Sequence, residues 1–190
     1  MNKLIDYICS IKLNLLSNVQ FYFAIIKDYD SKGGKALCSY LSVKEFSETE
    51  IGLIKYAESR GIHIHKNINP NIGVCGSLSP NSLVIEPDGM IQKCWGLVGN
   101  KETAVGNLLE EGTDREKYLC NQVKWLSWSA FEKKECKECN ILPLCMGGCP
   151  LHSLDETLDD SFKCHTYKYN LEKILMIMAE EYIKDKLKNK

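Results

Sequence analysis

Apolar residues near the start of the chain recur with the period of a helix. The four that define this first predicted helix are Leu4, Ile8, Ile11 and Leu15. The run that follows, 19–26, is rich in β-branched and aromatic residues, which favours a buried strand. The stretch 27–43 contains polar residues and two adjacent glycines, and predicts a long loop.

A second helix is predicted from its start signal. Ser47-Glu-Thr-Glu50 predicts a capping box, and apolar residues continue the helical period to Ala57. Gly61 fits a left-handed C-cap, and 62–65 predicts a short strand. Helix and strand in alternation predict a parallel α/β architecture. Because two strands and two helices cannot close a parallel sheet over a complete core, we expect another polypeptide, or the rest of a longer protein, to complete it.

The pattern changes near 67–76, which predicts a boundary. Two short apolar runs, 83–86 and 90–93, flank Pro87-Asp88-Gly89 and predict a hairpin. Its second strand would carry Cys94 at its end. We therefore expect the hairpin to present the Cys94 thiol as a ligand.

Two further helices are predicted. The first, at 114–134, spaces Trp125, Trp128 and Phe131 three apart. Core packing or cover for a buried cofactor is the favoured role of these aromatics, ahead of the floor of a substrate pocket. The second helix, at 169–187, ends in lysines and is expected to pack through one apolar face. That face consists of Leu171, Ile174, Leu175, Met178, Tyr182 and Ile183.

The overall charge excludes several classes of protein. The 190 residues include 24 Lys and Arg against 25 Asp and Glu, a formal net charge of -1. No basic block is present to hold a polyanion, so we expect no nucleic-acid partner. The longest apolar run, 19–26, is well short of the roughly 20 residues of a spanning helix, so no membrane role is expected. The N-terminus shows no signal peptide, and we expect a cytoplasmic protein.

Ten cysteines in such a chain need an explanation other than disulfides. Four fall within fourteen residues, as Cys136-x2-Cys139-x5-Cys145-x3-Cys149. Soft thiolates select zinc, copper(I) or iron-sulfur clusters. A structural zinc site pairs two short units across a longer loop, so this spacing favours iron-sulfur clusters. In two-cluster proteins the last cysteine of a run commonly ligates the other cluster, which leaves the remaining cysteines as partners.

Seven of these cysteines, with their local sequences, resemble the pattern of the SPASM domain. That domain is the C-terminal extension of many radical S-adenosylmethionine (radical SAM) enzymes that mature peptides and proteins. The matching segments are Cys75, Ser82-Leu-Val-Ile-Glu-Pro-Asp-Gly89 before Cys94, Val105-Gly-Asn-Leu108, the run from Cys136 to Cys149 with Gly147-Gly-Cys-Pro150, and Cys164. The resemblance covers about half of the chain. The segment before it resembles the last strands and helices of the partial barrel of the radical enzyme.

The resemblance implies a division of the chain and a set of ligands. Residues 1–70 would be the C-terminal portion of a partial parallel barrel, 71–168 a small α+β SPASM domain with a β-hairpin, and 169–190 a C-terminal helix. Each of the two auxiliary clusters would be of the 4Fe-4S type. Cluster I would be held by Cys75, Cys94 and Cys149. Cluster II would be held by Cys136, Cys139, Cys145 and Cys164.

Cluster I has three ligands in this scheme, and its fourth iron position is open to several donors. Water, a substrate thiolate, Cys120 or Cys38 each fit the sequence. Gly147 and Gly148 would let the backbone approach a cluster and donate N–H bonds to sulfur, which raises the reduction potential. The simpler interpretation of these two glycines, a tight turn, is compatible with that role.

The catalytic Cys-x3-Cys-x2-Cys motif of radical SAM enzymes does not occur in the 190 residues, because His152 stands where its third cysteine is required. This chain by itself is not expected to cleave S-adenosylmethionine. Three hypotheses follow. The chain is the C-terminal part of a maturase that modifies a ribosomal peptide or protein, with thioether or carbon-carbon crosslinks as typical products. Alternatively, it is a non-catalytic binding or electron-transfer module for a separate radical SAM partner, or a zinc-bound structural protein.

The remaining candidate residues are expected to be unremarkable. His63 and His65 share one face of a predicted strand and are interpreted as an exposed or core pair rather than metal ligands. His152 and His165 adjoin the cluster cysteines and are interpreted as surface residues. Lys32-Gly-Gly-Lys35 lacks the Walker spacing and is interpreted as a loop. Cys9 lies on the apolar face of its helix and is expected to be part of the core.

Overall fold

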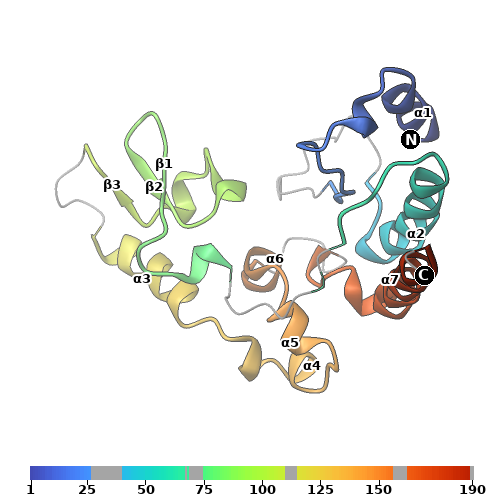
Figure 1. Cartoon of the computed structure of the whole chain (residues 1–190). Helices are drawn as coiled ribbons and strands as arrows, with labels where there is room; N and C mark the ends of the chain where they lie inside the picture. Colours follow the sequence, from blue (N-terminus) through green and yellow to red (C-terminus); the bar gives the residue numbers. More distant parts are fainter. Residues whose placement is uncertain (27–39, 67, 69–74, 110–114, 156–161, 189–190) are drawn as a thin grey trace. The chain divides into compact units, whose positions relative to one another are not determined.

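The computed structural model describes residues 1–26, 40–66, 68, 75–109, 115–155 and 162–188. Its contacts divide the chain into two compact units (Figure 1). Unit 1 comprises the described residues of 1–26, 41–69 and 166–190, and unit 2 comprises those of 27–40 and 70–165. Among the described residues, no helix combines the length and apolar character needed to cross a membrane.

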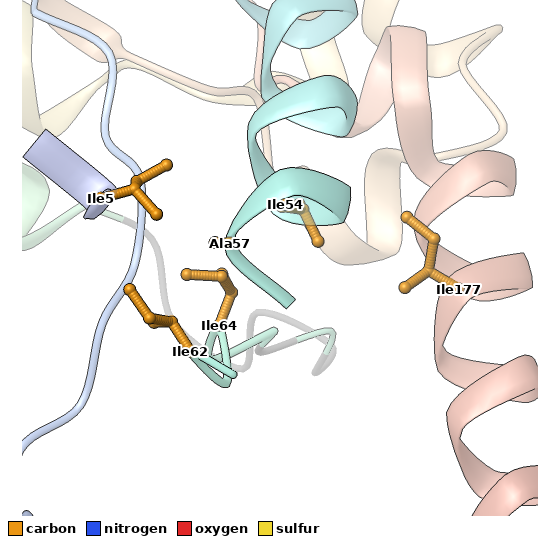
Figure 2. Close-up of a cluster of buried hydrophobic side chains, with 6 residues drawn as sticks. All are labelled: Ile5, Ile54, Ala57, Ile62, Ile64 and Ile177. Atoms are coloured by element: carbon orange, nitrogen blue, oxygen red, sulfur yellow. The ribbon is translucent and has the colours of Figure 1, made fainter. Parts of the chain in front are cut away.

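Unit 1 is built from helices around an isoleucine-rich core. Its elements are α1 (Asn2–Ser10), the 3-10 turn η1 (Leu13–Leu15), α2 (Val43–Ser59) and α7 (Tyr167–Lys188). The buried side chains at its centre are Ile5, Ile54, Ala57, Ile62, Ile64 and Ile177 (Figure 2). They come from α1, α2, the segment after α2, and α7, so segments far apart in sequence share one core.

Helix α2 begins earlier than predicted. Its capping box is formed by Ser42 and Glu45: the Ser42 hydroxyl accepts from the Glu45 N–H at 3.2 Å, and Glu45 Oε2 accepts from the Ser42 N–H at 2.8 Å. The predicted capping box at 47–50 is therefore wrong. Ser47 is buried inside the helix, where its hydroxyl donates to the carbonyl of Val43. The predicted left-handed C-cap is confirmed, since Gly61 has φ +78°.

The two strands predicted in unit 1 are reduced to a single parallel bridge between Phe21 and Ile64. The N–H of His65 donates to the carbonyl of Phe21 at 2.8 Å. Parallel strands are normally stabilised by neighbours and by covering helices. The segments around Phe21 and Ile64 have no further strand beside them among the described residues, so their pairing is limited to this one bridge. A partial parallel barrel remains a prediction.

The buried faces of the first and last helices match the prediction only in part. In α1 the buried residue is Ile5, whereas Leu4 is exposed. In α7 the buried positions are Asn170, Ile174 and Ile177, and α7 packs through them against α2. Of the other apolar residues predicted for that face, Leu175, Tyr182 and Ile183 are exposed. The remaining two, Leu171 and Met178, are half-buried. Each of these helices has apolar residues around more than one side, so periodicity alone did not select the buried face.

Unit 2 combines short strands with short helices and 3-10 turns. Its elements are η2 (Gly76–Leu78), β1 (Val84–Ile85), β2 (Met90–Gln92), η3 (Trp95–Leu97), η4 (Lys101–Thr103), β3 (Gly106–Asn107), α3 (Arg115–Leu126), η5 (Ala130–Glu132), α4 (Lys134–Lys137), α5 (Leu142–Cys145) and α6 (Pro150–Leu154). Strands β1 and β2 form the predicted antiparallel hairpin, with Ile85 opposite Ile91. Gly89 turns it with φ +84°. Strand β3 was not predicted and pairs antiparallel with β2.

The helix predicted at 114–134 is wrong in its extent. Helix α3 ends at Leu126, and η5 and α4 follow as separate short elements. The break has a local cause, because the Ser129 hydroxyl accepts from the Phe131 N–H at 3.2 Å and starts a new turn. Because of this break, Cys136 lies on the separate short helix α4 and not on α3.

Candidate metal centre

Two cysteines from separate elements of unit 2, Cys75 and Cys149, act electrostatically on a third, Cys94. Cys75 precedes η2, Cys94 follows β2, and Cys149 is the N-cap of α6. Burial raises the pKa of the Cys94 thiol, and the charges of Cys149 and Cys75 raise it further, whereas a hydrogen bond from the Gly96 N–H opposes the rise. A charge affects a thiol in this way only when it is near, so Cys75 and Cys149 lie close to Cys94. These are the three residues that the resemblance assigns to cluster I.

Two of the other four predicted ligands, Cys145 and Cys136, also respond to neighbouring thiols. Burial raises the pKa of Cys145, and the charges of Cys164 and Cys139 add to the rise. Hydrogen bonds from the N–H groups of His165 and Gly147 oppose it. Burial also raises the pKa of Cys136, with contributions from Glu135, Cys145 and Cys164 and an opposing one from Lys163. The thiols that raise these two pKa values, Cys139, Cys145 and Cys164, all belong to the second group.

The loop between Cys145 and Cys149 is packed tightly through its glycines. Gly147 and Gly148 have φ of +93° and +72°. A Cβ atom on Gly148 would lie 2.0 Å from the carbonyl oxygen of Lys163, so only glycine fits there. That carbonyl also accepts from the Cys149 N–H at 3.0 Å. The close approach joins the segment that carries Cys149 to the segment that carries Cys164.

The chemistry of these donors fits iron-sulfur clusters, since all seven are soft sulfur ligands. Within the described ranges, no three Cys, His, Asp or Glu side chains already converge closely enough to hold a metal ion. The two findings are compatible. A four-iron cluster holds its thiolates farther apart than a single zinc ion does, and charge influence extends beyond ligand distances.

The structure does not bring the other cysteines into these groups. Cys120 is exposed on α3, and its predicted role as an extra cluster I ligand stays a prediction. Cys38 and the segment 32–35 lie outside the described residues. Cys9 packs against the core of unit 1, as predicted, and its thiol donates to the carbonyl of Arg60 at 3.4 Å.

The histidines divide into one buried residue and three exposed ones. The interpretation of His152 as a surface residue is wrong: its exposed fraction is 2%, and its ring lies 5.6 Å from that of Phe162 between centroids. A residue on the first turn after Cys149 faces the interior because α6 packs inward through Pro150 and Leu151. His165 is exposed, and so are His63 and His65.

The predicted aromatic positions have different environments. Trp125 is buried in a cluster with Leu97 and Leu151, against which Cys94 and Cys149 pack. The same three residues line a cleft of about 360 Å³. Trp128 is half-buried, and its indole N–H donates to the Ser153 hydroxyl at 3.0 Å. Phe131 is 57% exposed.

Two polar residues near the cluster I cysteines were missed at the level of sequence. Ser77 is buried, and its hydroxyl donates to Cys75 Sγ at 3.2 Å. Lys93 is also buried, beside Cys94, and burial lowers its pKa. A lysine in the apolar run of a hairpin strand was the available signal, because lysine is rarely buried without a specific partner.

Over 78 residues the chain is 33% identical to the serine-type anaerobic sulfatase-maturating enzyme of Klebsiella aerogenes. The matched segment is 41% of this chain and 18% of that enzyme. No protein-family model matches the chain, and neither does any solved structure. The similarity supports the broad relationship to radical SAM maturating enzymes that the cysteine pattern predicts.

Proposed function

We propose that this chain is the C-terminal, cluster-binding part of a radical SAM enzyme that matures a ribosomal peptide or protein. The observation that carries the proposal is that the cysteines lie in two neighbourhoods, one around Cys94 and one around Cys145. The backbone bond from the Cys149 N–H to the Lys163 carbonyl connects the two segments. The partial similarity to a sulfatase-maturating enzyme supports the same class of chemistry.

In this proposal Cys75, Cys94 and Cys149 hold auxiliary cluster I. Auxiliary cluster II is held by Cys136, Cys139, Cys145 and Cys164. When bound, such 4Fe-4S clusters transfer single electrons or bind a thiolate at an open iron. The Gly96, Gly147 and His165 N–H groups that bond to cysteine sulfur would stabilise the more negative, reduced state.

The radical-generating step would come from a separate segment or chain that binds S-adenosylmethionine. Support comes from unit 1, where parallel pairing is limited to the bridge between Phe21 and Ile64 among the described residues. Large apolar side chains near that bridge in sequence, Tyr22 and Ile26, are exposed. We propose that the missing strands of a partial barrel extend this bridge and cover such residues.

A second candidate is a non-catalytic module that binds peptide or transfers electrons for a separate radical SAM enzyme. Because the 190 residues do not contain Cys-x3-Cys-x2-Cys, both candidates place the radical-generating cluster outside them. Mixing the chain with candidate radical SAM partners, and measuring peptide modification with and without it, separates the two candidates. Modification that requires both chains supports the module.

The direct test is to measure iron, acid-labile sulfide and zinc per chain after anaerobic purification and reconstitution. Two 4Fe-4S clusters would give about eight irons and a signal of reduced clusters in the electron paramagnetic resonance (EPR) spectrum. Stoichiometric zinc without iron would overturn the proposal in favour of a structural thiolate site.

A further inference from the structure

Lys93 is a buried cation with an unusual set of partners. It follows β2 directly, precedes Cys94, and has an exposed fraction of 2%. Its ammonium group donates to two backbone carbonyls, those of Ser79 and, at 2.8 Å, Ser82. No ion pair joins Lys93 to a carboxylate within the described part of the chain.

Burying this ammonium is costly, since a charged group loses its hydration in the interior. A methionine of similar length would fill the same space without that cost. Because both acceptors are main-chain atoms, the bonds of Lys93 fix the path of the backbone at 79–82 rather than the position of another side chain.

The segment that Lys93 holds is continuous with Cys75. The Leu78 N–H donates to the Cys75 carbonyl at 2.9 Å, and the Ser79 N–H donates to the Gly76 carbonyl at 2.9 Å. The Ser82 N–H donates to the Ser79 carbonyl at 3.3 Å. These bonds wind 75–82 into successive turns, so a restraint at Ser79 is transmitted to Cys75 over four residues.

We infer that Lys93 is a positioning residue that ties the turn carrying Cys75 to the strand end carrying Cys94. It thereby sets the separation of two cluster I ligands before the cluster binds. This inference rests on the proposed function. A buried lysine supplies three donors in one point charge, so it can hold two carbonyls of a loop that has no strand partner of its own.

The test is Lys93→Met, with Lys101→Met as the matched control because Lys101 is exposed in the same unit. All proteins are reconstituted anaerobically as the full chain. We expect Lys93→Met to lose about half of the iron, from about eight to about four per chain, and to lose only the EPR signal of cluster I. Lys93→Arg, which keeps the charge and the donors, is expected to recover part of that signal.

Each other outcome is decisive. Lys93→Met with eight irons and unchanged spectra would overturn the inference, because Cys75 would not need the restraint. Loss of both clusters, or loss of the circular dichroism of the folded chain, would also overturn it, since Lys93 would then serve the whole unit. A wild-type chain that binds no iron would instead overturn the proposed function, whatever the variants do.

Discussion

The Ser77 hydroxyl donates a hydrogen bond to the sulfur of Cys75 across 3.2 Å. Ser77 has an exposed fraction of 6%, whereas Cys75 is exposed, so the bond reaches a surface thiol from the protein interior. Hydrogen bonds to ligand sulfur stabilise the reduced, more negative cluster and raise its reduction potential.

Ser77→Ala is therefore expected to lower the reduction potential of cluster I without loss of iron. Removal of one buried hydrogen bond costs about 0.5–1.5 kcal/mol of folding free energy, which the chain should tolerate. Redox titration followed by EPR measures the potential. Ser79→Ala is the control, because that serine is exposed. Equal potentials in the wild type and Ser77→Ala would contradict the prediction.

Removal of a cluster II ligand should affect both metal content and stability. Cys136→Ala or Cys164→Ala is expected to lower iron from about eight to about four per chain and to lower the melting temperature of unit 2. The reason is that between Cys136 and Cys164 the buried hydrophobic residues are Ile141, Leu151 and Phe162 among those described, so cluster binding is expected to contribute to folding there. Cys120→Ala is the comparison, and loss of cluster I in it would identify the fourth ligand. Unchanged iron and melting temperature in the first two variants would refute the assignment.

Comparing the stability losses of Gly148→Ala and Gly99→Ala separates the cost of a left-handed backbone from the cost of a steric clash. Both glycines have positive φ, +72° and +84°. A Cβ on Gly148 would clash with the Lys163 carbonyl at 2.0 Å, whereas nothing lies within 4 Å of a Cβ on Gly99. Gly99→Ala should cost the left-handed penalty alone, about 1–2 kcal/mol. Gly148→Ala should cost clearly more and reduce iron binding, and equal losses in urea unfolding would show that the clash is relieved.

The partly buried carboxyl group of Glu50 should make the stability of unit 1 depend on pH. Burial raises its pKa, and the hydrogen bond from the Asn170 amide, 2.8 Å long, opposes the rise. Between the unfolded pKa, about 4.3, and the raised folded pKa, the folded state binds more protons. Stability should therefore fall as pH rises through this window.

The variant that tests this dependence is Glu50→Gln, which removes the titrating group and keeps an acceptor for Asn170. Urea unfolding at several pH values should show a higher free energy of unfolding at pH 7 and a flatter profile than in the wild type. Glu48→Gln, at an exposed position of the same helix, should leave the profile unchanged. A wild-type stability that rises through the window would contradict the sign.

Lys66 links α2 to α7 through two carboxylates. Its side chain is 4% exposed and pairs with Glu58 and, at 2.7 Å, with Glu181. Burial would lower the pKa of Lys66, but the two carboxylates outweigh it and raise that pKa. Lys66→Met leaves the two carboxylates facing each other, and should cost about 3–5 kcal/mol at pH 7.

Acidification should recover part of that loss, because protonation removes the repulsion between the two carboxylates. Lys44→Met, at an exposed position of α2, should change the free energy of unfolding by less than about 0.5 kcal/mol. Urea unfolding at pH 7 and pH 5 measures both effects. A Lys66→Met variant as stable as Lys44→Met would show that the ion pairs contribute nothing net.

Local sequence predicted the features that depend on near neighbours. Asp88-Gly89 predicted the hairpin because a tight turn is specified by its own residues, and Gly61 predicted a helix end for the same reason. Cysteine spacing predicts sulfur ligation, since a short loop determines which thiols can share a centre, and this stays a prediction. It also indicated the maturase relationship that the partial similarity supports.

Features that depend on long-range packing were decided only by the tertiary structure. The buried face of α7 is set by its contact with α2, and periodicity does not specify it because apolar residues lie on more than one side of the helix. Burial of His152 and Lys93 follows from segments distant in sequence, and the bond from Lys93 to the Ser79 carbonyl joins residues fourteen positions apart. Sequence thus determined which atoms are available for chemistry, and the packing of distant segments determined which of them lie together.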